Sequence, residues 1–184
     1  RPISVALNLG VSHLQWIVDG YNLTYALLLL TGGLLGDLMG RRSIFIIGVG
    51  IFCAGCLTCG LAPGAPILIT GRILAGLGAA LLLPASLAIL RVEWPDPVER
   101  GHALGVWAGC NGLAFAIGPT LGGLLIEGFG WRSVFLIALP VGAVACVLAW
   151  KSVPESSNPQ GRHFDPVGQM LGALALGGLA LAAI

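Results

Sequence analysis

The fold of this chain is decided by residues 66–90, which read PILITGRILAGLGAALLLPASLAIL. Arg72 is the only charged residue in this stretch, and most of the others are apolar or small. A helix needs about 20 predominantly apolar residues to cross the hydrocarbon core of a bilayer. Residues 66–90 therefore predict a transmembrane helix.

Comparable stretches follow one another along the chain. Hydrophobic residues make up 57% of it and charged residues 9%, whereas a soluble domain has about 25% charged residues. Windows long enough to cross a membrane also lie at 15–36, 43–61, 103–126 and 131–150, and a sixth at 166–184 is nearly long enough. The sequence predicts an all-α, polytopic bundle of transmembrane helices.

We expect this bundle to be incomplete at both ends. Residues 3–9 resemble the tail of an earlier span, and the last window is still apolar at residue 184.

The formal net charge of +1 and the scattered basic residues argue against a nucleic-acid partner. The spacing of Cys53, Cys56 and Cys59 is similar to that of iron–sulfur ligands. These cysteines lie within one continuous apolar helix, however, so we expect no metal site.

The basic residues of the loops are distributed unevenly between the two sides of the membrane. If the windows alternate in direction, one side carries only Arg132, and the other carries six basic residues: Arg41, Arg42, Arg91, Arg100, Lys151 and Arg162. Lys and Arg are enriched in cytoplasmic loops. We therefore expect a multi-pass protein of the inner or plasma membrane, with the Arg41–Arg42 loop and the 151–164 linker in the cytoplasm.

Two charged residues lie inside predicted spans, Asp19 in the first window and Arg72 in the third. A charge inside the membrane costs at least about 2.5 to 3.5 kcal/mol, so each needs a partner or access to water. Both lie at similar depths from the same side, which allows an ion pair or a shared polar cavity. A carboxylate beside a cation in low dielectric can support proton coupling. Alternatively, Asp19 lies in the interface with access to water.

Small residues and one proline are the other unusual features of the spans. Pro119 removes a backbone hydrogen bond in the middle of its window, and its glycine neighbours permit close approach of another helix, so we expect a bend or tight packing there. Small residues at helical spacing predict further close contacts at Gly32, Gly36 and Gly40, and at Gly71, Ala75, Gly78 and Ala79.

The segment at 33–42, GLLGDLMGRR, resembles the loop signature between the second and third helices of the major facilitator superfamily. The resemblance implies that Asp37 holds a charge network that latches two helical bundles on the cytoplasmic side. It also implies that Gly40 turns the chain and that Arg41 contributes a cation. Gly33 and Arg42 belong to the same motif. Leu38 stands where the family usually has arginine.

Three further segments resemble the fourteen-span drug–proton antiporters of this superfamily. Residues 69–80 resemble the fourth-helix motif, whose arginine is linked to proton transfer and corresponds to Arg72. Residues 15–21 resemble the opening of the second helix. Residues 114–123 resemble the fifth-helix antiporter motif, which is associated with exporters and contains Gly118, Pro119, Gly122 and Gly123. Asn111, on the same helix, would either contact substrate or make an interhelical hydrogen bond.

The resemblance implies a secondary transporter that exports drugs or other small molecules by alternating access, driven by protons. Residues 1–150 would form most of the amino-terminal six-helix bundle, 151–164 a cytoplasmic linker and 165–184 the start of an additional central helix. The expected partners are a small-molecule substrate, protons, the lipid bilayer and the remainder of the transporter chain. We expect no catalytic residue and no cofactor, with the proton gradient as energy source. The alternatives are a membrane-embedded enzyme and a non-transporting sensor on the same scaffold.

Overall fold

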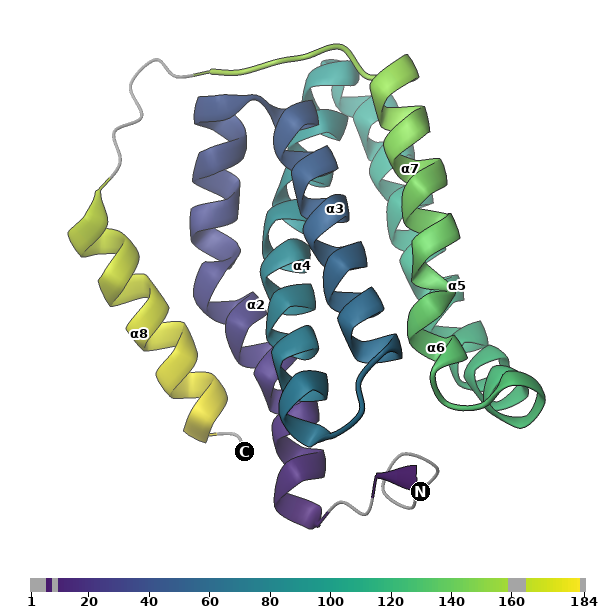
Figure 1. Cartoon of the computed structure of the whole chain (residues 1–184). Helices are drawn as coiled ribbons and strands as arrows, with labels where there is room; N and C mark the ends of the chain where they lie inside the picture. The colour runs from purple at the N-terminus through teal and green to yellow at the C-terminus, as the bar shows by residue number, and fades with distance from the viewer. Residues whose placement is uncertain (1–5, 8–9, 159–164, 183–184) are drawn as a thin grey trace.

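The computed structural model describes residues 6–7, 10–158 and 165–182 (Figure 1). Every regular element in these residues is a helix. The elements in chain order are α2 (Val11–Met39), α3 (Arg41–Gly60), α4 (Ala65–Glu93), α5 (Pro97–Phe129), α6 (Ser133–Leu136), α7 (Ala138–Ser152) and α8 (Pro166–Ala182). The expected tail of an earlier span at 3–9 lies mostly outside the described residues.

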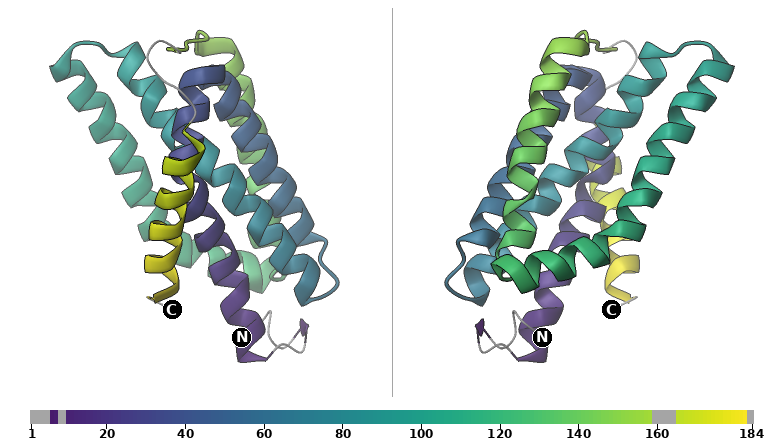
Figure 2. Two further views of the ribbon diagram at one scale, coloured as in Figure 1. Left: turned by 90° about the vertical axis from the view of Figure 1, so that its left-hand side faces the viewer. Right: turned by 90° about the vertical axis from the view of Figure 1, so that its right-hand side faces the viewer.

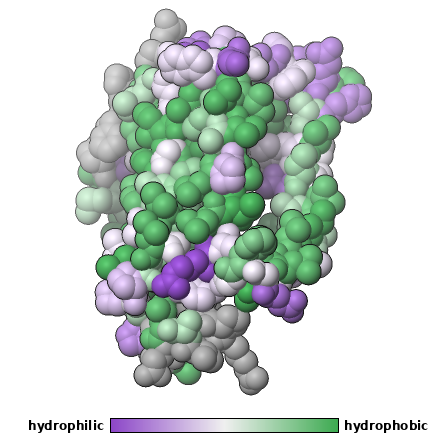
Figure 3. Space-filling model, turned by 45° about the vertical axis from the view of Figure 1, so that its right-hand side comes forward, coloured by the Kyte–Doolittle hydropathy of each residue, from purple (hydrophilic) through white to green (hydrophobic). Residues whose placement is uncertain are grey.

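Each predicted transmembrane window corresponds to helical structure. Within the described residues, five segments are long and apolar enough to cross a membrane: α2, α3, α4, α5, and α6 with α7 as one segment. Figure 3 shows hydrophobic side chains over the middle of one face, with hydrophilic residues gathered toward its two ends. This pattern is typical of a bundle surrounded by hydrocarbon. The prediction of an all-α transmembrane bundle is confirmed.

The helices extend beyond the apolar windows at several ends. The connection between the windows 66–90 and 103–126 is shorter in the structure than the gap between these windows, because α4 continues to Glu93 and α5 already begins at Pro97. Asp96 caps α5, since its Oδ1 accepts the backbone N–H groups of Val98 at 2.9 Å and Glu99 at 3.0 Å. A cap of this kind satisfies N–H groups that have no partner inside the helix.

Helices α2, α3 and α4 form the tightly packed part of the bundle. Glycines bring the backbones of α3 and α4 into contact at two levels. A Cβ added at Gly78 would overlap the backbone of Phe52, and one added at Gly71 would lie 2.9 Å from the backbone nitrogen of Cys59. Gly32 is close to the Ala80 carbonyl in the same way. The close contacts predicted at Gly32, Gly71 and Gly78 are confirmed, whereas a Cβ at Gly36 would meet no atom within 4 Å in the described residues.

Helix α5 is the least enclosed element of the bundle. None of its residues is buried against the rest of the described chain. Figure 2 shows that its second half, which contains Pro119, bends toward α6 and α7. Proline cannot donate the hydrogen bond that would continue the helix ladder and is a common cause of such bends. The bend expected in this helix is therefore present.

Helix α8 lies along α2 and packs against it through its small residues (Figure 1). The hydroxyl of Thr31 donates a 2.8 Å hydrogen bond to Oε1 of Gln169. Farther along, Leu30 and Leu27 of α2 contact the positions of Gly172 and Gly177. A polar pair combined with small residues is a common way for helices to associate in a membrane. The last apolar segment is thus attached to α2.

Candidate functional site

The turn between α2 and α3 forms the first candidate site. Gly40 has a φ of +108°, and its N–H donates to the Gly36 carbonyl at 3.2 Å, so the chain reverses direction within one residue. This backbone conformation is accessible mainly to glycine. The turn brings Arg41 back onto Asp37, which is only 7% exposed. The Oδ1 atom of Asp37 accepts hydrogen bonds from Nη2 of Arg41 at 2.8 Å and from Nε at 3.1 Å.

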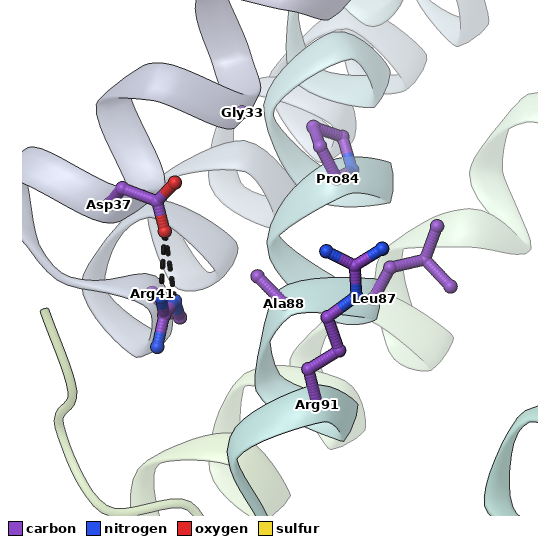
Figure 4. Close-up of a pocket in the computed structure, with 7 residues that line it drawn as sticks. All are labelled: Gly33, Asp37, Arg41, Pro84, Leu87, Ala88 and Arg91. Atoms are coloured by element: carbon purple, nitrogen blue, oxygen red, sulfur yellow. Dashed lines mark hydrogen bonds and ion pairs between the residues drawn. The ribbon is translucent and has the colours of Figure 1, made fainter. Parts of the chain in front are cut away.

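A cavity of about 290 Å³ opens beside this ion pair (Figure 4). Its walls come from α2, from Arg41 at the start of α3 and from the last turns of α4. Figure 4 shows the Arg91 side chain turned back along α4 toward Leu87. The cavity therefore has a polar mouth with two guanidinium groups and one carboxylate, next to an apolar wall. The lining residues are Gly33, Asp37, Arg41, Pro84, Leu87, Ala88 and Arg91.

The segment that follows α7, residues 153–158, lies against the same turn. Its Glu155 carboxylate is bonded to the first turn of α3 and lies 3.7 Å from Nε of Arg42. Partial burial raises the pKa of Glu155, but hydrogen bonds from Ser43, Ser156 and Arg42 outweigh it and hold the pKa below its ordinary value. Glu155 was not among the site residues predicted from the sequence. It is the only acidic residue between Lys151 and Phe164, beside a loop with adjacent arginines, and this charge pattern was the available signal.

Arg72 lies in α4 at the other candidate site, within the membrane-spanning part. Its Nε donates a 2.8 Å hydrogen bond to the carbonyl of Ile17, and its guanidinium lies 4.5 Å from the centre of the Tyr21 ring. Both partners belong to α2. A hydrogen bond and a cation–π contact offset part of the cost of placing a charge in low dielectric. The half-buried Arg72 therefore has specific partners, as expected for a charge inside the membrane.

Asp19 is not one of these partners. In the part of the chain that the structure describes, the ion pairs are Arg41–Asp37 and Arg42–Glu155. Ile17 and Tyr21 are four residues apart and share one face of α2, whereas Asp19 lies about 200° around the helix from Ile17. The ion pair considered for Asp19 and Arg72 is therefore absent from the described structure. Similar depth in the membrane did not place the two residues on facing sides of their helices.

The glycines of the fifth-helix motif contact nothing in the described structure. A Cβ added at Gly118, Gly122 or Gly123 would meet no atom within 4 Å among the described residues. Tight packing at this motif is thus not seen within these residues, although the helix bends near it. The role of Gly118, Pro119, Gly122 and Gly123 in transport stays a prediction.

Asn111 donates a hydrogen bond within its own helix. Its Nδ2 donates to the carbonyl of Trp107 at 2.7 Å, so the alternative of an interhelical hydrogen bond is not what the described residues show. Both side chains line a largely apolar cavity of about 500 Å³ between α3, α4, α5 and α7. Phe45, Leu82 and Leu83 belong to this cavity and also to a second one of about 530 Å³, which includes Tyr21 and Phe115.

Because several of the described helices are long and apolar enough to cross a membrane, the protein belongs to the class of polytopic α-helical membrane proteins. The chain belongs to the Major Facilitator Superfamily, whose sequence model matches residues 2–183. The resemblance to this family inferred from the sequence motifs is therefore confirmed.

The relatives include proteins named for drug resistance and efflux. The chain is 42% identical over 175 residues to the multidrug resistance protein Stp of Mycobacterium tuberculosis, covering 95% of this chain and 33% of Stp. It is 39% identical to the methylenomycin A resistance protein of Bacillus subtilis, covering 97% of this chain and 38% of that protein. The multidrug efflux pump LfrA of Mycolicibacterium smegmatis is 40% identical over 85% of this chain and 31% of its own length. The chain thus spans about a third of the length of these relatives.

Solved transporters share the fold. A crystal structure of the peptide transporter POT matches with a TM-score of 0.70 at 19% identity, over 96% of this chain and 38% of POT. A structure of the transporter PepTSo2 matches with a TM-score of 0.65 at 18% identity, over 96% of this chain and 41% of that one. At this level of identity, the match concerns the fold.

Proposed function

We propose that the whole protein is a proton-coupled exporter of drugs or similar small molecules that works by alternating access. The observation that carries this proposal is the ion pair between the buried Asp37 and the partly buried Arg41 at the α2–α3 turn, in a chain that belongs to a transporter superfamily. Relatives named as multidrug efflux pumps and resistance proteins support the choice of cargo. A transporter, rather than an enzyme, is also favoured by the family.

In this proposal the charged end of the bundle, which holds Asp37, Arg41 and the end of α4, faces the cytoplasm. The end of the bundle with Arg41, Arg42, Arg91 and Lys151 is rich in basic residues, whereas Arg132 lies at the other end. The Asp37–Arg41 pair lies within one bundle and would fix the α2–α3 turn that faces the rest of the whole protein on the cytoplasmic side. Contacts made by this turn would break and form again as two bundles rock around a central site.

Arg72 would handle charge in the transport pathway. It is held by a carbonyl and an aromatic ring and not by a carboxylate among the described residues, so its positive charge is not neutralised there. The ionised form of a carboxylate that approaches Arg72 would be favoured, so this carboxylate would release its proton. Asp19, on another face of α2, would take part through water and not through direct contact with Arg72.

The test is proton-driven efflux of a fluorescent cationic drug in membrane vesicles that contain the whole protein, with and without Arg72→Ala. We expect the variant to insert at the normal level and to lose proton-driven efflux, because the cation that would favour release of a proton from a nearby carboxylate is removed. Lys151→Ala, an exposed cation at the end of α7, is the matched control and should transport normally. Unchanged proton-driven efflux by Arg72→Ala would overturn the coupling role.

A further inference from the structure

Helix α3 begins without a side-chain cap from its own neighbourhood. The preceding residue is Gly40, which has no side chain to accept the N–H groups of the first turn. The Glu155 carboxylate takes this place, although it is 113 residues from Arg42 and 112 residues from Ser43 in the sequence: its Oε1 accepts the backbone N–H of Arg42 and its Oε2 that of Ser43, each at 3.1 Å. The hydroxyl of Ser43 also donates to Oε2. A negative group is favoured here because the helix dipole is positive at its amino-terminal end.

The segment around Glu155 is bonded to the turn by its backbone as well. The N–H of Arg41 donates to the Ser156 carbonyl at 2.9 Å, and the N–H of Asn158 donates to the Asp37 carbonyl at 2.9 Å. These two bonds involve the backbones of both members of the Asp37–Arg41 ion pair. Residues 153–158 therefore fix the backbone at Asp37 and at Arg41, whose side chains form the ion pair.

Arg42 ties the same segment to the end of α7. Its Nη1 donates to the Val153 carbonyl at 3.2 Å, and its guanidinium lies 5.2 Å from the centre of a Trp150 ring. Arg42 thus points toward α7 and the segment after it, while Arg41 points toward Asp37. The two adjacent arginines therefore contact different parts of the chain.

The shape of the turn fits the carboxylate. A Cβ added at Gly40 would lie 2.6 Å from Oε1 of Glu155 and 2.7 Å from its Cδ. Glycine at this position therefore serves the reversal of the chain and also leaves room for Glu155.

We propose that Glu155 is a positioning residue for the Asp37–Arg41 ion pair, acting as a cap on α3 supplied by the segment after α7. Glu155 acts through the backbone of Arg42 and Ser43, and so fixes the point from which Arg41 reaches Asp37. Its importance for transport rests on the proposed function. Its action as a cap does not, so the two can be tested separately.

The experiment uses the whole protein with Glu155→Ala and Glu155→Gln, where glutamine keeps one oxygen acceptor but loses the charge. Glu93→Gln, an exposed carboxylate at the end of α4, is the matched control. The first measurement is hydrogen exchange of the peptide that contains the start of α3. Glu155→Ala should exchange about 2- to 30-fold faster there, the range expected for loss of a helix cap, and Glu155→Gln should be intermediate.

The second measurement is proton-driven export at several substrate concentrations. Glu155→Ala should lower the maximal rate about threefold or more and leave the concentration for half-maximal rate unchanged, because Glu155 lines none of the cavities described above. Combining it with Ser43→Ala should add less than the sum of the two single effects, since the two side chains share one contact.

The outcomes separate the two proposals. Normal exchange at the start of α3 in Glu155→Ala would overturn the cap. Faster exchange with an unchanged maximal rate would overturn the positioning role. If the unmodified protein shows no proton-driven export, the proposed function fails, whereas the exchange measurement still decides whether Glu155 caps α3.

Discussion

Among the individual residues, Gly40 is required to be glycine for two structural reasons. Its φ of +108° is strained for any residue with a Cβ, and that Cβ would also displace the Glu155 carboxylate. We expect Gly40→Ala to lower the free energy of unfolding by about 1–3 kcal/mol through backbone strain. The measurement is the thermal unfolding midpoint of the purified whole protein in detergent.

Gly64→Ala is the matched control for Gly40→Ala. Gly64 also precedes a helix, but its φ of −166° is extended, and an added Cβ would make only an ordinary 3.9 Å contact with Pro66. Its midpoint should stay close to that of the unmodified protein. Equal midpoints for both variants would contradict the special role of Gly40.

The contact between Glu155 and α3 should depend on pH in a definite direction. The pKa of Glu155 is lowered in the folded protein, so the ionised carboxylate stabilises the fold at pH values above its unfolded pKa of about 4.3. This contribution is lost as the pH falls through the lower folded pKa. The midpoint difference between the unmodified protein and Glu155→Gln should be constant from about pH 7 to pH 5 and shrink below about pH 4.3. A difference that already disappears near pH 6 would contradict this assignment.

The sequence predicted some residues of the candidate site and missed others for physical reasons. Asp37, Gly40 and Arg41 lie within four residues of one another. The local backbone therefore largely determines how they are arranged, and a short sequence motif can predict this arrangement. Glu155 reaches the same turn from a distant segment, and a single sequence does not show which segments meet. For Asp19, the sequence window gives the depth in the membrane but not the rotation of α2 about its axis, which decides the direction of a side chain.

Among the helices, the pair α3 and α4 depends on glycine for its close approach. An added Cβ at Gly78 would overlap the backbone of Phe52, whereas one at Gly50 would meet no atom within 4 Å in the described residues. Gly78→Ala should therefore push the helices apart and cost about 1–3 kcal/mol, the usual range for overpacking. The thermal unfolding midpoint should fall for Gly78→Ala and stay the same or rise for Gly50→Ala. A smaller loss for Gly78→Ala than for Gly50→Ala would contradict this packing.

Helix α8 should remain attached to α2 in the membrane. Leu30 reaches the position of Gly172, so cysteines at these two positions should cross-link under mild oxidation in native membranes. Leu171, which precedes Gly172 in α8, is 62% exposed. The control is therefore the pair Leu30→Cys and Leu171→Cys. Equal cross-linking of the two pairs, or none, would show that α8 does not pack on α2 in this register.

The boundaries of the helices were predicted less well than their existence. Apolar windows mark the hydrocarbon thickness, but helices continue into the interface, as α4 does to Glu93. The start of α5 depends on the Asp96 cap and Pro97, a local signal that hydropathy does not contain. The window 131–150 is divided into α6 and α7, since a turn at Ile137 separates them.

In the molecule as a whole, the tightly packed helices α2, α3 and α4 contrast with the sparsely packed α5 and α7. The largely apolar cavities of about 500 and 530 Å³ lie between these two groups. The charged end carries the ion pair of the buried Asp37 with Arg41, and the segment after α7 is bonded to this turn. In the proposed alternating-access cycle, this bundle would move as one body.

The most direct test of this account is transport by the purified whole protein in liposomes with an imposed pH gradient and no nucleotide. The account predicts that a fluorescent cationic drug moves against its concentration gradient while protons move the other way, and that a protonophore stops this movement. Drug movement that is unaffected by collapse of the pH gradient, or absent at every gradient, would contradict it.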